Sequence, residues 1–257
     1  MIGKKIPLIP PIFLNNEFIS DFQEKAKAFN KYFSEQCTPI VNSSEIPTRV
    51  ILETNEVLDN FFFSVTDISN IINNLDPNKS HGYDNISVRL IKICGLSICR
   101  PLNIIFFNCL SQGIFPEYWK KANVVPVHKK NEKYLLNNYR PISLLPIFSK
   151  IFERLIFNSI YNYLISNNLL SPHQSGFKPG DSCTYQLLSI THIINNSLDH
   201  NESHEVRGVF LDMSKAFDRV WHAGLIHKLK TLGISGNLLM LLKSFLSDRK
   251  QRVGING

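Results

Sequence analysis

The sequence predicts an α+β fold that is rich in helices and has few, short strands. Long stretches repeat apolar residues at helical spacing, most clearly over residues 147–164. Short apolar runs typical of strands occur at 124–127 and 206–212. A doubly wound nucleotide-binding fold is excluded because the chain lacks both the GxGxxG and the GxxxxGK[ST] pattern.

The first 60 residues form the first predicted unit. Three prolines, at positions 7, 10 and 11, indicate an extended lead over residues 1–15. Five small or aromatic residues at helical spacing then predict an amphipathic helix over 17–35. Prolines and polar clusters over 38–60 are typical of a linker. We therefore place a connector at 1–60 and a second domain at 61–257.

The second domain opens with helices around one short strand. The expected elements are a helix over 66–75, a helix that starts at Val88, breaks at Pro101 and continues through Leu110, a strand at 124–127, and a helix over 147–164. Pro126 cannot donate a hydrogen bond to a neighbouring strand, so we expect this strand at a sheet edge or a bulge.

Further elements follow a basic, turn-rich loop at 176–180. They are a helix over 183–192, a buried strand over 206–212, helices over 220–232 and 238–246, and a basic turn that enters a strand near Val253. Asp212 ends the 206–212 strand. A carboxylate held there can bind a hard divalent cation or simply cap the next helix.

Composition narrows the classes of function. Of the 257 residues, 44% are hydrophobic, and the net charge is +7 with a pI of about 9.1. This charge favours an acidic partner, with nucleic acid ahead of a membrane surface; the alternative is a solvated basic surface. Five scattered cysteines without a CxxC pair argue against zinc and disulfides, and for an intracellular protein, in nucleus or cytoplasm. No apolar run has transmembrane length.

Four segments, in a fixed order, carry a family resemblance. They are Lys79–Ile86, Asn123–Lys130 with 138–145, His173–Gly180, and Phe210–Val220. Together they resemble the reverse transcriptase domain of non-LTR, LINE-type retrotransposons, over about residues 65–257. The first 60 residues resemble the connector that joins an upstream endonuclease to the polymerase in such elements.

The resemblance implies a right-hand polymerase with fingers and palm, acting as an RNA-directed DNA polymerase. Its partners would be an RNA template, a DNA primer and deoxynucleoside triphosphates, without a membrane. Asp212 matches the palm carboxylate that binds both catalytic ions, Mg²⁺ or Mn²⁺, and Met213 would add a backbone carbonyl. Phe217 matches the aromatic residue under the incoming sugar, where a large ring excludes a 2′-hydroxyl; ordinary packing is the alternative.

The resemblance also assigns basic residues to the incoming triphosphate. Arg140 matches the fingers arginine, whose guanidinium suits phosphate oxygens. Either Lys129 or Lys130 matches the basic residue of the same fingers strand, and the sequence does not choose between them. The alternative for all three is a solvated surface position.

A loop around Gly176 matches the template support of the family. Gln174, Gly176, Phe177 and Lys178 fall on its positions, and the glycine is expected to let the backbone approach closely. Lys178 replaces the usual arginine, so the planar fork for a bidentate contact is lost. In the first segment Tyr83 replaces the usual proline.

The largest departure is that no Ala-Asp-Asp occurs in the chain. In the family this turn carries the other metal carboxylate and precedes the thumb. We therefore expect a C-terminally truncated domain, with fingers and the first half of the palm, that is inactive alone. The alternative function is a catalytically dead remnant that binds nucleic acid. The sequence does not predict an oligomeric state.

Overall fold

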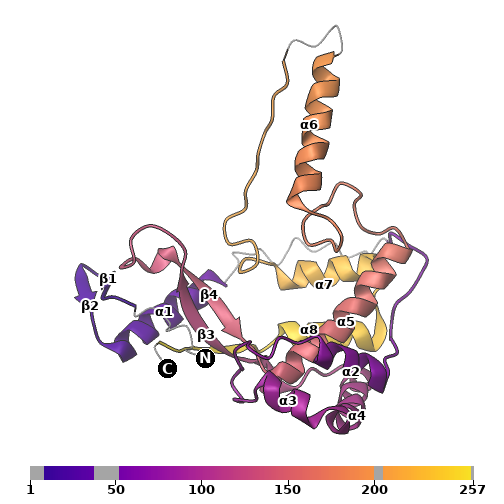
Figure 1. Ribbon diagram of the computed structural model, residues 1–257, viewed down its shortest axis with the longest axis horizontal. Coiled ribbons are helices and arrows are strands. Elements are labelled where there is room, and N and C mark those ends of the chain that lie inside the picture. The colour runs from indigo at the N-terminus through magenta and orange to yellow at the C-terminus, as the bar shows by residue number, and fades with distance from the viewer. Residues whose placement is uncertain (1–8, 38–51, 200–204, 256–257) are drawn as a thin grey trace.

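The computed structural model describes residues 9–37, 52–199 and 205–255 (Figure 1). Its helices are α1 (Phe22–Gln36), α2 (Val65–Asn73), α3 (Val88–Cys94), α4 (Leu96–Gln112), α5 (Ile147–Ser166), α6 (Cys183–Asp199), α7 (His222–Thr231) and α8 (Gly236–Leu246). Two short 3₁₀ helices, η2 (Glu117–Lys120) and η3 (Leu136–Asn138), precede strands. The strands are β1 (Ile12–Leu14), β2 (Glu17–Ile19), β3 (Lys121–His128), β4 (Tyr139–Leu144) and β5 (Lys250–Val253). The helix-rich α+β prediction is confirmed.

The larger core joins α2, α3, α4, α5 and α8 through apolar stripes. Phe152 of α5 is fully buried and stacks on Phe106 of α4 and on Phe115, with ring centroids 4.7 and 5.8 Å apart. Truncating such a residue to alanine costs about 3–5 kcal/mol of stability. The apolar residues at helical spacing over 147–164 therefore face the core. The helix predicted from them is confirmed as α5.

A three-stranded sheet, in the order β4-β3-β5, stands beside this helical core. β3 pairs antiparallel with β4 and parallel with β5. We expected this strand at a sheet edge or a bulge; β3 is instead the central strand, and its register against β4 is continuous. The parallel pairing ends at Val124, however, so Pro126 has a strand neighbour on the β4 side alone, where it faces Pro141. A missing N–H is tolerated at such a position.

The N-terminal segment covers one face of this sheet. Phe29 and Phe33 of α1 pack with Val124 and Tyr139, and the Phe29 and Tyr139 ring centroids lie 4.9 Å apart. The helix starts at Phe22, so the predicted start at 17 is wrong; residues 17–19 form β2 instead. Asp21 begins the helix because its carboxylate accepts hydrogen bonds from the backbone N–H groups of residues 23 and 24.

The β1–β2 hairpin was not predicted. The hairpin begins within the Pro-rich lead expected at 1–15. Residues 1–8 of that lead, and residues 38–51 of the expected linker, lie outside the described residues. Lys25 of α1 is only 2% exposed, and its Nζ donates to the Ile9 carbonyl oxygen at 2.9 Å. The connector boundary at residue 60 stays a prediction.

The predicted break at Pro101 is also wrong. Pro101 lies inside α4, and the chain bends by 104° between α3 and α4 at Gly95, which has a φ of +52°. Glycine takes this left-handed conformation without the steric cost of a Cβ. No single helix among the described residues is long and apolar enough to cross a membrane; the bent α3–α4 pair reaches that length and composition.

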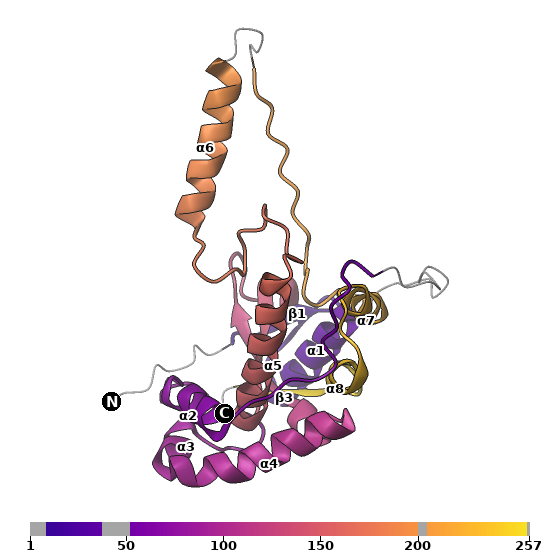
Figure 2. The same cartoon turned by 90° about the vertical axis from the view of Figure 1, so that its right-hand side faces the viewer.

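An arm made of α6 and residues 205–213 projects from the rest of the molecule (Figures 1 and 2). None of the described side chains of α6 is buried, and Phe210 and Leu211 are 88% and 93% exposed. The predicted buried strand over 206–212 is wrong: this segment is extended but pairs with no described strand. An apolar run forms a strand only where a neighbour accepts its backbone hydrogen bonds and covers its side chains.

Candidate functional site

The uncovered face of the β4-β3-β5 sheet gathers cationic side chains. The register places Arg140 beside Val127, Arg252 beside Asn123, and Lys250 beside Lys121. These positions alternate with the buried Ala122 and Val124, so they share the face opposite α1. The predicted nucleotide-binding residue Arg140 is exposed there. The sheet thus presents a basic surface built from three strands.

Lys129 and Lys130 lie just past β3, in the connection to β4. Both are exposed, and the Lys129 backbone N–H donates to the Asn138 carbonyl oxygen at 2.8 Å, which closes the hairpin. One ring nitrogen of His128 lies 3.0 Å from the Asn131 carbonyl oxygen. Among the described residues neither lysine pairs with a carboxylate within 4.0 Å. Both ammonium groups are therefore free to meet an anion.

A cluster of cations surrounds Tyr83 where β3 and β5 pair, at the β5 edge of the sheet. The sequence did not predict this cluster. The Arg252 Cζ lies 4.5 Å from the Tyr83 ring centroid, and the Lys121 Nζ lies 5.5 Å from it. Lys121 also lies 5.4 Å from the Tyr118 ring. The Arg252 Nε donates to the Asn123 Oδ1 at 2.7 Å, which fixes the guanidinium. Aromatic faces attract cations, so the cluster holds positive charge at this edge.

Gly82 allows Tyr83 to reach the sheet. A Cβ on Gly82 would lie 2.3 Å from the Leu145 carbonyl carbon and from the Pro146 nitrogen. Only glycine fits at position 82, because its backbone packs directly against the backbone that joins β4 to α5. The departure from proline at position 83 was visible in the sequence, but its partners come from segments far along the chain, so spacing did not reveal them.

The predicted template loop is exposed and contacts the predicted sugar-packing residue. The Phe177 ring meets the Phe217 ring edge to face, with centroids 5.6 Å apart. The Gln174 Nε2 donates to the Gly176 carbonyl oxygen at 3.1 Å. A Cβ on Gly176 would meet no atom of this chain within 4 Å, so the expected close approach of this backbone to a template stays a prediction. Phe177 instead takes the positive φ, +60°, and Lys178 is half-buried.

Asp212 and Met213 lie at the base of the arm, and both are exposed. The turn that follows them contacts α1, where the Lys215 Nζ lies 5.2 Å from the Tyr32 ring centroid. Among the described residues, no hydrogen bond or ion pair joins Asp212 to Arg140 or to another predicted site residue. The structure brings Phe177 to Phe217, but it leaves the candidate carboxylate by itself.

The donor set does not by itself fit a pair of divalent cations. Within the described ranges no three His, Cys, Asp or Glu side chains gather in a way that could hold a metal ion. Asp212 contributes one carboxylate, and two cations need carboxylates from more than one segment.

The comparisons with known proteins agree on one family. The family model for reverse transcriptase (RNA-dependent DNA polymerase) matches residues 127–257. The chain is 33% identical over 241 residues to the probable RNA-directed DNA polymerase from transposon BS of Drosophila melanogaster, covering 93% of this chain and 26% of that protein. It is 31% identical to the RNA-directed DNA polymerase from mobile element jockey of the same species, covering 93% and 25%. The chain thus spans about a quarter of the length of these relatives.

Proposed function

Because this chain belongs to the reverse transcriptase family, we propose that it holds the RNA template and the incoming deoxynucleotide in the polymerase of a non-LTR retrotransposon. The observation that supports this most is the basic sheet face, on which Arg140, Lys121 and Arg252 lie, one from each of the three strands. Nucleic acid carries one charge per phosphate, and such a surface neutralises several of them.

Arg140 is the proposed contact to the triphosphate. Its guanidinium is planar and keeps its charge, so it can hold two phosphate oxygens at once. Lys129 and Lys130, at the end of β3, extend the positive charge toward the hairpin tip. A lysine there acts as a point charge and needs no fixed geometry.

Phe217 and the 174–178 loop are the proposed limits of the pocket for base and sugar. The edge-to-face contact between Phe177 and Phe217 supports this role, because it joins the two segments. Gln174, Gly176 and Lys178 would support the template beside it. A large ring beneath the sugar selects deoxynucleotides by excluding a 2′-hydroxyl.

Asp212 is the proposed metal carboxylate, with the Met213 carbonyl as a second oxygen ligand. Reverse transcriptases generally use divalent metal ions, which stabilise the charge that develops during phosphoryl transfer. Mg²⁺ or Mn²⁺ suits these oxygen ligands. The remaining ligands would come from a longer polypeptide, and DNA synthesis is proposed only for that context.

The test is salt-dependent binding of a primer–template by this chain. If about three to five phosphates are contacted, a plot of log affinity against log salt should have a slope of roughly −2 to −5. The triple variant K129Q/K130Q/R140Q should flatten the slope by about 2 to 3, since each lost phosphate contact removes roughly one unit.

The matched control is K27Q/K31Q/R100Q, which loses the same charge from α1 and α4. It should keep the slope of the unaltered chain, because α1 covers the other face of the sheet. An equal loss in both triple variants would mean that net charge alone drives binding, and it would overturn the assignment to the sheet face.

A further inference from the structure

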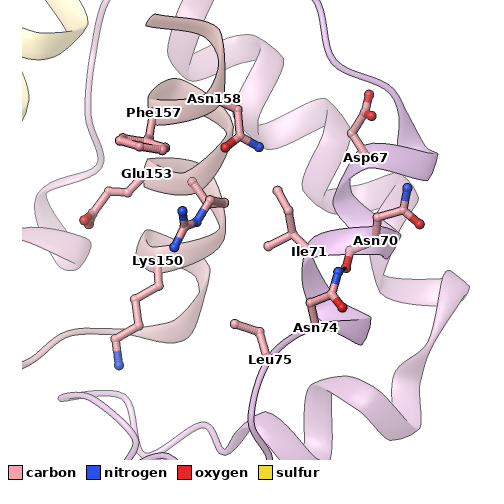
Figure 3. Close-up of a pocket in the computed structure, with 10 residues that line it drawn as sticks. Asp67, Asn70, Ile71, Asn74, Leu75, Lys150, Glu153, Phe157 and Asn158 are labelled. Atoms are coloured by element: carbon pink, nitrogen blue, oxygen red, sulfur yellow. Dashed lines mark hydrogen bonds between the residues drawn. The ribbon is translucent and has the colours of Figure 1, made fainter. Parts of the chain in front are cut away.

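A groove of about 970 Å³ lies between α2 and α5, apart from the sheet face (Figure 3). One wall is formed by Lys150, Arg154 and Phe157 of α5, and the other by Asn70 and neighbouring residues of α2. Figure 3 shows Ile71 projecting from α2 between the two helices. The groove therefore combines an apolar floor with charged and amide groups.

An aromatic column runs along the α5 wall. The Arg154 guanidinium carbon lies 5.3 Å from the Phe157 ring centroid. The Phe157 and Tyr161 rings are stacked, with centroids 5.5 Å apart and planes inclined by 14°. Phe157 is nevertheless 43% exposed. Aromatic rings and guanidinium planes are the surfaces on which unpaired bases stack.

Two side-chain amides that line the groove, those of Asn70 and Asn158, are available for hydrogen bonding. The Asn74 Nδ2 is already engaged, because it donates to the Asn70 carbonyl oxygen at 2.9 Å. The side chains of Asn70 and Asn158 make no hydrogen bond within the part of the chain that the structure describes. An amide offers a donor and an acceptor together, which is the pattern on the edge of a base.

Two cations, Lys150 and Arg154, line the groove together with two carboxylates, Asp67 and Glu153. Burial lowers the pKa of Lys150, and no carboxylate lies within 4.0 Å of Lys150 or Arg154 among the described residues. The Asp67 carboxylate is engaged as the N3 member of the α2 capping box, where it accepts from the Ser64 N–H at 2.7 Å. Burial raises the pKa of Glu153, whose carboxylate accepts from the Ser149 hydroxyl at 2.5 Å.

We propose that the groove between α2 and α5 binds an unpaired nucleotide of a single-stranded nucleic acid. The base lies against the column of Arg154 and Phe157, its edge meets Asn70 or Asn158, and a phosphate meets Lys150. The inference rests on the proposed function in taking nucleic acid as the ligand. An acidic peptide would use the positive charge but would leave the aromatic column and the amides without a role.

The experiment measures base stacking directly. The 257-residue chain is titrated into a ten-nucleotide single-stranded oligoadenylate RNA that carries one 2-aminopurine, whose fluorescence falls on stacking. The double variant R154Q/F157L should abolish the quenching of fluorescence and weaken binding about fivefold to a hundredfold. The matched control R100Q/F107L makes the same changes at exposed positions of α4 and should behave as the unaltered chain.

A second variant tests the groove without changing the aromatic column, in case R154Q/F157L disturbs the fold. N70A/N158A changes two exposed side chains without altering the column. It should retain quenching and weaken binding by about fivefold, in line with the loss of roughly one hydrogen bond. Thermal melts of all variants within about 2 °C of the unaltered chain would show that each change is local.

The outcomes separate this inference from the proposed function. If R154Q/F157L keeps both quenching and affinity while K129Q/K130Q/R140Q loses affinity, the groove inference is overturned and the sheet assignment stands. If the unaltered chain binds no RNA even at about 50 mM salt, both are overturned. Binding of a ten-residue oligoglutamate as tightly as the RNA would replace the nucleotide by an acidic peptide and also overturn the inference.

Discussion

Gly82→Ala tests how the loop that carries Tyr83 is seated. The added Cβ would lie 2.3 Å from two backbone atoms, of Leu145 and Pro146, and 2.5 Å from the Leu145 carbonyl oxygen. Real Cβ atoms do not approach backbone so closely. The loop or the corner between β4 and α5 must therefore move, because no flexible side chain can rotate away.

The magnitude follows from two opposing terms. Overpacking costs about 1–3 kcal/mol, and a clash with backbone belongs at the upper end. Alanine also restricts the unfolded chain, which stabilises by about 0.4–1 kcal/mol. The net loss is then about 2 kcal/mol. At roughly 2–4 °C per kcal/mol for a domain of this size, the Tm should fall by about 4–8 °C.

The assay is thermal unfolding followed by circular dichroism, beside a matched Gly254→Ala control. A Cβ on Gly254 would meet nothing within 4 Å, so its Tm should be unchanged or slightly raised. If Gly82→Ala melts within about 1 °C of the unaltered chain, the close approach is wrong. The placement of Tyr83 against Lys121 and Arg252 would then lose its basis.

Three further predictions concern the helix cap, the arm and catalysis. Asp67→Ala should destabilise by about 1 kcal/mol through loss of the hydrogen bonds that its carboxylate accepts from Ser64 in the α2 capping box; because these hydrogen bonds lower the Asp67 pKa, this contribution should be present at neutral pH and vanish as pH falls through the lowered value. The exposed apolar arm should bind a hydrophobic dye and promote association at micromolar concentration; replacing Phe210 and Leu211 by Ser should reduce both, and a dye-free monomer before substitution would contradict it. The 257-residue chain alone should extend no primer with Mg²⁺, because Asp212 stands alone as a candidate metal carboxylate among the described residues; robust extension would refute this.

The helices of the larger core were predictable because each of them buries one face. α2, α5 and α8 carry apolar stripes at helical spacing, and those stripes fill the larger core. The bend between α3 and α4 was misplaced because proline is the stronger signal in a sequence. Pro101 is accommodated inside α4, whereas the positive φ of Gly95 makes the turn.

The strands were harder to predict because their partners are distant. Residues 206–212 have the composition of a buried strand, yet nothing in the described chain pairs with them. β1 and β2 are only three residues each, too short for a period-two pattern to be distinctive. The local sequence indicates the β-propensity of a segment, but whether it forms a strand depends on a neighbouring strand with which it can pair.

The candidate site was predictable in part. Family motifs marked Arg140, and its place on the uncovered sheet face fits a contact with phosphate. The cluster of Tyr83, Lys121 and Arg252 was not visible, because its members come from three distant segments. The groove between α2 and α5 was missed for the same reason: its two walls come from helices that are far apart in the sequence.

The most direct test of the account is primer extension by a longer polypeptide that includes this chain, since the chain spans only about a quarter of the length of its relatives. Asp212→Asn removes the proposed metal carboxylate. Asp218→Asn, six residues later in the same turn region, is the matched control. Loss of a metal ligand should cost roughly a thousandfold or more in rate, while the control keeps near-normal extension. Near-normal extension by Asp212→Asn would contradict the account and leave Asp212 as an ordinary surface residue.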